Sequence, residues 1–347
     1  MQTIGRELGV KYLLEGSVRK ASDELRLNAQ LVDAATGNEL WAQRYDWPMR
    51  DIFRLQDEIV RSLAATVKLE VGLMGRGYDF GPQRTKNLEA YDYFLRGMET
   101  WLSTSPGGFA QARKMLEKSV ELDPDYADPY ALLAFWDWLE YAWQRNNDVG
   151  ALNRALERAN KSISLDGSNS LPYTVRAWVA IMQDEREQAL LDAGHAVTVE
   201  PNSAFAWMAR ADVNNALSGK PEETLTYVEK ARRLDPRHPE IGCLQEGSAY
   251  NYMEHYAEAA EALKGCENSS INWQSAGGAY NPYTHVGLVF AYSQLGREQE
   301  ARNEAAEVVH VSPGFSLEKM QRMSSGINWQ DPQRQHFLAV LRKAGLK

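Results

Sequence analysis

Apolar residues recur every three or four positions along most of the chain, in segments that each end at a short stop. The stops are Asp123-Pro124, Asp166-Gly167, Glu200-Pro201, Asp235-Pro236 and Ser312-Pro313. The second positions of the first four stops lie 43, 34 and 35 residues apart, a period typical of stacked helical hairpins. Proline suits such a stop because it lacks an N–H group and disfavours helical geometry in the preceding residue. The pattern predicts a mainly α-helical array.

Small residues precede each stop, and bulky residues follow it at the spacing of one helix face. The small residues are Ala112 and Ser119, Ala155 and Ser162, Ala189 and Ala196, Thr224 and Ala231, and Ala301 and Val308. The anchors that follow are Tyr130 with Leu133 and Ala134, Tyr173 with Ala177, Trp207 with Ala211, Gly247 with Tyr250, and Leu288 with Tyr292. Over roughly residues 88–313 this pattern resembles the tetratricopeptide repeat family. The resemblance implies an α-solenoid of about six helical hairpins over residues 87–313, followed by a capping segment over 314–347.

The first part of the chain alternates apolar and polar residues with period two, which is typical of strands. Residues 10–20, 24–33 and 39–46 are predicted to form an antiparallel meander, and a helix is predicted from Asp51 to cover it. Leu25, Leu27, Ala29 and Leu31 form the expected inward face of the second strand. In the third strand the inward-facing residues are either Leu40 with Ala42 or Trp41 with Gln43, and the sequence does not decide between them.

Residues 8–59 resemble the TolB-N-terminal-like region found between the effector domain and the tetratricopeptide repeats of large bacterial regulators. The resemblance implies a small α/β domain over residues 1–71 that starts partway into the family's pattern, followed by a Gly-rich linker over 72–86. Such a truncated unit would either lean on the first repeat or present an unpaired strand edge. Exposed edges recruit partners, so a homodimer through this edge is an alternative role.

The formal net charge of −9 is unevenly distributed. Of the 38 basic and 47 acidic residues, 13 and 12 lie in residues 1–86, which leaves a net charge of −10 on the rest. An acidic array without clustered Lys and Arg argues against nucleic-acid binding. It favours neutral or basic protein and peptide partners.

Two cysteines, Cys243 and Cys266, are too few for a disulfide framework. Reduced thiols and a cytoplasmic location are therefore the simpler expectation, with pairing as the less favoured alternative. No apolar run approaches the roughly 18 residues that a membrane span needs. A periplasmic location is the alternative if a span lies upstream of this region in a longer protein.

No pattern of catalytic or ligand-binding residues is found. The histidines are scattered, no Cys-x-x-Cys pair occurs, and no Gly-x-Ser-x-Gly or Walker motif is present. We therefore expect no catalytic residue, metal or cofactor, and a non-catalytic interaction, scaffold or sensory module. In the regulators that the chain resembles, a class III adenylate or guanylate cyclase domain or a winged-helix domain often comes first. A fragment of a cyclase that lacks its catalytic domain is thus an alternative identity.

The resemblance implies a concave groove lined by the first helices of successive hairpins, where a peptide would bind. The expected groove residues are Phe135, Trp138, Val175, Trp178, Met182, Asp212, Asn215, Gln245, Asn251 and Phe290. For each of them, burial in a hairpin core is the alternative. Asp212, Asn215 and Asn251 are favoured for the groove because unpaired polar groups avoid cores.

Two further expectations concern apolar clusters. Trp136, Trp138, Tyr141 and Trp143 are expected to pack between hairpins, with a hydrophobic lip on the groove as the alternative. In the capping segment, Phe337, Leu338 and Leu341 are expected to be buried, while Arg334, Arg342, Lys343 and Lys347 stay in solvent.

Overall fold

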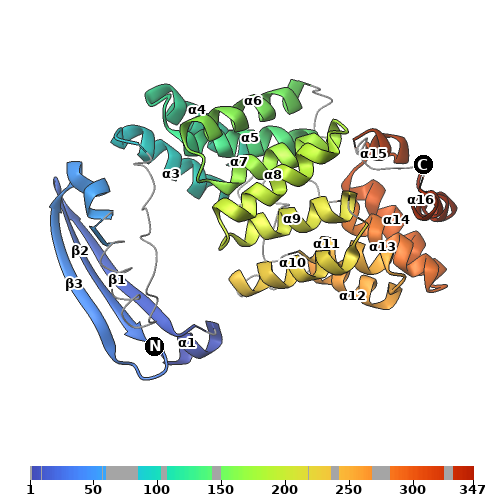
Figure 1. Ribbon diagram of the computed structural model, residues 1–347, viewed down its shortest axis with the longest axis horizontal. Helices are drawn as coiled ribbons and strands as arrows, with labels where there is room; N and C mark the ends of the chain where they lie inside the picture. Colours follow the sequence, from blue (N-terminus) through green and yellow to red (C-terminus); the bar gives the residue numbers. More distant parts are fainter. Residues whose placement is uncertain are drawn as a thin grey trace. The chain divides into compact units, whose positions relative to one another are not determined.

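The computed structural model describes residues 2–8, 10–56, 58–59, 85–102, 108–142, 150–217, 219–235, 242–267, 282–323 and 331–347. The chain divides into two compact units, Met1–Leu88 and Glu89–Lys347. Figure 1 shows the first as a sheet and the second as an array of helices. Most of the predicted linker, Trp143 and most of the segment between Cys266 and Tyr283 lie outside the described residues.

The first unit is a three-stranded antiparallel meander. Helix α1 (Gln2–Leu8) precedes strands β1 (Tyr12–Ala21), β2 (Glu24–Asp33) and β3 (Glu39–Pro48), which pair in chain order. This confirms the predicted sheet. The β2–β3 register places Trp41 opposite Leu31. Because paired residues point to the same face, Trp41, and not Leu40, shares the face of Leu31.

The helix predicted from Asp51 covers one face of this sheet. A 3-10 turn, η1 (Met49–Asp51), leads into helical residues 52–56. Leu55 is buried in one cluster with Leu25 of β2 and Tyr45 of β3. These residues come from β2, β3 and the helix, so the core of the unit lies over the second and third strands.

Strand β1 is an edge of the sheet and its apolar residues are open. Leu14 and Val18 pair with Leu31 and Leu27, which places all four on the same face. Nevertheless 55% of Leu14 and 61% of Val18 is exposed. The described residues therefore include an edge strand with both unpaired backbone groups and uncovered apolar side chains.

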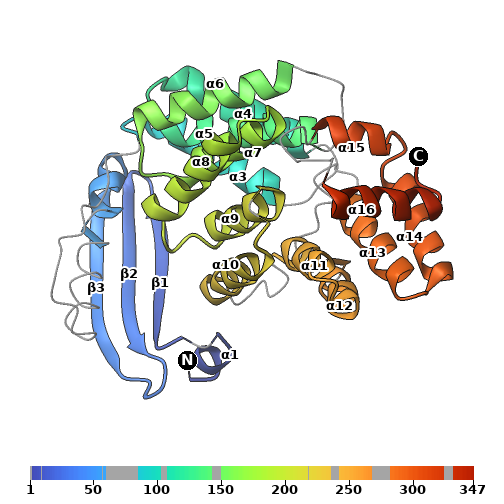
Figure 2. The ribbon, with the colours of Figure 1, turned by 45° about the vertical axis from the view of Figure 1, so that its right-hand side comes forward.

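The second unit consists of consecutive helix pairs. They are α3 (Leu88–Leu102) with α4 (Gly108–Leu122), α5 (Ala127–Ala142) with α6 (Gly150–Leu165), α7 (Ser170–Met182) with α8 (Arg186–Val199), α9 (Ala204–Leu217) with α10 (Pro221–Leu234), α11 (Cys243–Tyr252) with α12 (Tyr256–Glu267), and α13 (Pro282–Gln294) with α14 (Glu298–Val311). From α5 onward each helix packs against its partner and each second helix against the next pair. Figure 2 shows the pairs following one another, and the predicted solenoid is confirmed.

Small residues allow the two helices of a pair to approach closely. The predicted positions Ala112, Ala155, Ala189, Ala196 and Ala231 have no exposed surface. In two pairs the later small position is a serine that also forms a hydrogen bond. The Ser119 hydroxyl donates to the Ala90 carbonyl at 2.7 Å, and the Ser162 hydroxyl donates to the Ala127 carbonyl at 3.0 Å. Each bond ties the second helix to the start of the first.

The capping segment folds back on the last pair. Helix α15 (Leu317–Met323) precedes α16 (Pro332–Lys343), which Asp331 caps by accepting from the Gln333 N–H group. Leu338 and Leu341 are fully buried with residues of α13 and α14. The expected burial of these two residues is confirmed, and their side chains pack against the last helix pair.

The expected exposure of Arg334 was wrong. Its guanidinium Nη2 donates to the Ala216 carbonyl of α9 at 2.8 Å, and burial lowers the pKa of Arg334. Asp331 and Pro332 start α16 so that its first turn lies beside α9, 118 residues earlier in the chain. Helical periodicity within the segment could not show this contact.

The expectation of unpaired cysteines was also wrong, because Cys243 and Cys266 form a disulfide. The helices α11 and α12 are consecutive and packed, so the start of one meets the end of the other, with the two Cα atoms 5.6 Å apart. The disulfide removes one ground for the cytoplasmic expectation, since disulfides persist mainly in oxidising compartments. Among the described helices, none is long and apolar enough to cross a membrane.

Leu263 of α12 provides a test of the close packing. It lies between Gly247 of α11 and Gly287 of α13, and a Cβ atom at position 247 would overlap its side chain. We expect Gly247→Ala to lower the free energy of unfolding, because a clash of about 1–3 kcal/mol exceeds the gain in helix propensity of about 1 kcal/mol. Denaturant titration of both proteins measures the difference.

Gly265 is the matched control, because it lies in α12 and a Cβ atom there meets nothing within 4 Å. Gly265→Ala should stabilise the protein by about 0.5–1 kcal/mol. Equal effects of the two substitutions would contradict the packing at Leu263.

Candidate functional site

The first helices of successive pairs form one continuous layer. Helix α5 packs against α7, α7 against α9, α9 against α11, and α11 against α13. We call the surface of this layer the first-helix face. The second helices make their contacts from the other side, so side chains of the first helices that do not point into a pair lie on this face.

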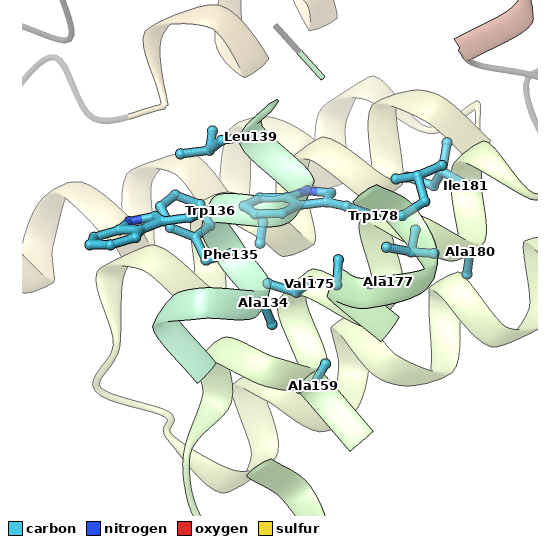
Figure 3. Close-up of a cluster of buried hydrophobic side chains, with 14 of the residues drawn as sticks. Ala134, Phe135, Trp136, Leu139, Ala159, Val175, Ala177, Trp178, Ala180 and Ile181 are labelled. Carbon is cyan, nitrogen blue, oxygen red and sulfur yellow. The ribbon is translucent and has the colours of Figure 1, made fainter. Parts of the chain in front are cut away.

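Aromatic side chains dominate the first-helix face at α5, α7 and α9. The rings of Trp138 and Trp178 stack with centroids 4.1 Å apart. Phe205 meets Trp178 edge to face at 5.7 Å and meets Phe135 at the same distance. Figure 3 shows Phe135 and Trp178 lying close together above the alanines of the layer. Such ring pairs stabilise the contact beyond the burial of their area.

The expected groove residues fall into two groups by burial. Phe135, Val175, Trp178 and Phe290 are almost completely buried. For these four residues the structure agrees with the alternative expectation, burial in a hairpin core. Trp138, Met182, Asp212 and Asn215 are half-buried, and Gln245 and Asn251 are largely buried. Phe290 is covered by the chain itself, because Phe337 and His336 of α16 pack against its ring. Of the predicted aromatic cluster, Trp136 is fully buried against Phe109, as expected, whereas Trp138 and Tyr141 are half-buried.

Two of the expected polar residues hold neighbouring helices together. The Asn215 side chain donates to the Gln245 carbonyl at 2.7 Å and accepts from the Thr224 hydroxyl at 2.8 Å. The Asn251 amide donates to the Gly287 carbonyl at 3.1 Å, while its Oδ1 atom has no hydrogen-bond partner in the described part of the chain. Asn215 is thus satisfied within the array, whereas the Oδ1 atom of Asn251 is buried without a hydrogen bond in the described residues.

Asp212 has the most unusual environment of the set. Loss of solvent raises the pKa of its carboxyl group to about 6, an effect that the nearby side chains of Gln245 and Trp178 partly oppose. No Lys, Arg or His of the described residues forms an ion pair with it. Removing a carboxyl group from water without a cation beside it costs free energy. Carboxyl groups in such environments are common at binding sites.

Two buried carboxyl groups of the array, those of Asp137 and Asp192, are neutralised by arginines. Asp137 of α5 is fully buried and accepts from Arg113 of α4 at 2.8 Å and from Arg158 of α6 at 2.5 Å. Asp192 pairs with Arg176 at 3.1 Å. These pairs connect helices and offer no open site. Within the described ranges, no group of three His, Cys, Asp or Glu side chains is placed to hold a metal ion.

Two residues of this region were missing from the expected set. Phe205 lies on α9 seven residues before Asp212, a spacing that places both on one helix face and could have identified it. Arg334 comes from α16, and only the folded chain places it near α9.

The paired helices, the buried small residues at equivalent positions and the recurring stops define an α-solenoid of the tetratricopeptide-repeat type.

No family model matches the chain. Over 195 residues it is 37% identical to a protein of Rhizobium meliloti (strain 1021) named "Putative adenylate cyclase 3", which covers 54% of this chain and 33% of that protein. Over 155 residues it is 25% identical to the "DnaJ homolog subfamily C member 7 homolog" of Dictyostelium discoideum, covering 43% and 28%. The chain thus spans about a third of the length of the curated relatives it matches.

Among solved structures, the chain is similar to Pseudomonas aeruginosa PilF, with 20% identity, coverage of 74% of this chain and 99% of that one, and a TM-score of 0.44. It is also similar to a chain of the APC/C hetero-tetramer Cut9-Hcn1, with 14% identity, coverage of 80% and 54%, and a TM-score of 0.49.

The raised pKa of Asp212 predicts a specific pH dependence of stability. Its folded pKa, about 6, lies above the ordinary value of 3.8, so the protonated carboxyl group is favoured in the folded state. The stability this gives is fully present below about pH 4 and is lost as the pH rises through about 6. Asp212→Asn should keep it, and should be the more stable form at pH 7 by at most about 3 kcal/mol, less in practice because the residue keeps part of its surface in solvent.

The measurement is the free energy of unfolding of both proteins between pH 4 and pH 7. All other titrating groups are common to the two, so the difference should grow with pH between about 4 and 6. A difference that is constant with pH would contradict the environment described for Asp212.

Proposed function

We propose that this chain is a non-catalytic interaction module that binds an extended peptide or protein segment on its first-helix face. The observation that carries the proposal is the surface of α5, α7 and α9. Partly exposed apolar side chains, Trp138, Phe205 and Met208, lie there together with the half-buried carboxyl group of Asp212. Apolar side chains interspersed with a few polar groups are typical of surfaces that hold peptides.

The similarity to a cyclase-named protein bears on the setting of this module. The chain matches 33% of the length of that relative. No catalytic constellation was found in the sequence, and Asp137 of α5 and Asp192 of α8 are held in ion pairs with arginines. We therefore assign to this chain a regulatory interaction role in a signalling protein, and no nucleotide chemistry.

Selection from a random 12-residue peptide library on the immobilised chain tests the proposal. Peptides should be enriched, and their affinity should fall about tenfold, or about 1.4 kcal/mol, on the double variant Met182→Ala, Met208→Ala, which trims partly buried side chains of the first-helix face. Leu191→Ala is the matched control, because Leu191 is an exposed residue of the second helix α8. No enrichment, or an equal loss with Leu191→Ala, would refute peptide binding on this face.

The edge strand supports a second candidate role, self-association through β1. Leu14 and Val18 are exposed on a strand whose outer edge is unpaired among the described residues. Pairing with β1 of a second copy would satisfy that edge and cover both side chains.

Light scattering tests this role. If β1 pairs two copies, Val18→Lys should shift the protein from dimer to monomer, because a charged side chain on the covered face opposes pairing. Ser17→Lys, on the opposite face of the same strand, is the control for added charge. A wild-type protein that stays monomeric at high concentration would exclude the role.

A further inference from the structure

Unlike the buried Asp137 and Asp192, Asp212 forms no ion pair among the described residues. Asp137 and Asp192 each pair with arginines from neighbouring helices. The carboxyl group of Asp212 lies between Trp178 of α7 and Gln245 of α11, which supply only neutral polar groups. Arginines within the array therefore neutralise some of its carboxyl groups, whereas the Asp212 carboxyl group, on the first-helix face, could pair with a cation of a bound ligand.

The arginines nearest to this stretch of α9 are all used elsewhere. The Arg186 and Arg334 guanidinium groups donate to the carbonyls of Leu217 and Ala216, at 3.0 and 2.8 Å. Arg210 donates to the Leu190 carbonyl at 2.8 Å. At the end of α9, Arg186 and Arg334 satisfy the last carbonyls of the helix and interact favourably with its dipole. None of these three arginines forms an ion pair with Asp212, although Ala216 lies only one helical turn beyond it.

The contact of Arg334 shows what this part of the face accommodates. It belongs to α16, outside the helix pairs, and its guanidinium group reaches the end of α9 with much of its surface covered. An arginine side chain that arrives from outside the pairs thus fits beside α9. One turn back along the same helix, the Asp212 carboxyl group offers a stronger acceptor to such a group.

The aromatic side chains beside Asp212 favour a cation over other ligands. Trp178 approaches Asp212, stacks on Trp138 and meets the edge of Phe205. Guanidinium and ammonium groups bind well where a carboxylate and indole rings lie side by side, and their alkyl stems pack on the ring surface.

Building on the proposed peptide-binding function, we propose that Asp212 is a specificity-determining residue that pairs with an arginine or lysine side chain of the bound segment. The alkyl stem of that side chain lies along the half-buried Trp138, whose other surface stacks on Trp178. The net charge of −10 on residues 87–347 complements a basic ligand and speeds its approach.

The random 12-residue peptide library provides the test, with selections run in parallel on the wild type, Asp212→Asn and Glu222→Gln. Glu222 is an exposed residue of the second helix α10, so its variant removes one negative charge away from the first-helix face. Wild type and Glu222→Gln should enrich peptides with Arg or Lys at one position, and Asp212→Asn should lose that preference. Thermal unfolding of the isosteric Asp212→Asn variant shows whether it remains folded.

Synthesis of the most enriched peptide with citrulline or glutamine in place of its basic residue completes the test. Affinity for the wild type should fall at least tenfold, while Asp212→Asn should bind both versions equally. Enriched peptides without a basic preference, or a preference that persists in Asp212→Asn, would overturn this assignment and leave peptide binding intact. A library with no enrichment at all would overturn both.

Discussion

The structure of the array depends on how closely the two helices of each pair approach. Positions such as Ala112, Ala155 and Ala189 have no exposed surface, because a second helix occupies the space that a larger side chain would need. At Ser119 and Ser162 the same approach is reinforced by hydrogen bonds to the first helix. Protein interiors are packed densely enough that one added methyl group at such a contact is felt.

This packing also decides where the large side chains lie. Because small residues fill the contacts within pairs, the aromatic rings of α5, α7 and α9 gather on the other side, where Trp138, Trp178 and Phe205 contact one another. The first-helix face is therefore a consequence of the hairpin geometry. Asp212 lies on this face beside those rings, and it forms no ion pair within the described part of the chain.

Much of this arrangement follows from local pattern in the sequence. The recurring stops and small residues predict the helix pairs, because each reflects a constraint within a single hairpin. The sequence could not show which residues of β3 share the face of Leu31, because both sets of alternate residues fit the pattern equally well. Only the pairing of Leu31 with Trp41 separates them. The disulfide between Cys243 and Cys266 and the reach of Arg334 to Ala216 depend on which segments meet in three dimensions. The hydrogen-bond partners of Asn215, on α10 and α11, could not be predicted for the same reason.

The central claim is that the first-helix face, and not the second helices, holds the ligand. Hydrogen–deuterium exchange of the chain with and without a library-selected peptide tests it most directly, since binding slows exchange where the backbone becomes more stable. The account predicts added protection concentrated in α5, α7, α9 and α11. Protection concentrated in α6, α8 and α10, or in the β1–β3 sheet, would contradict it.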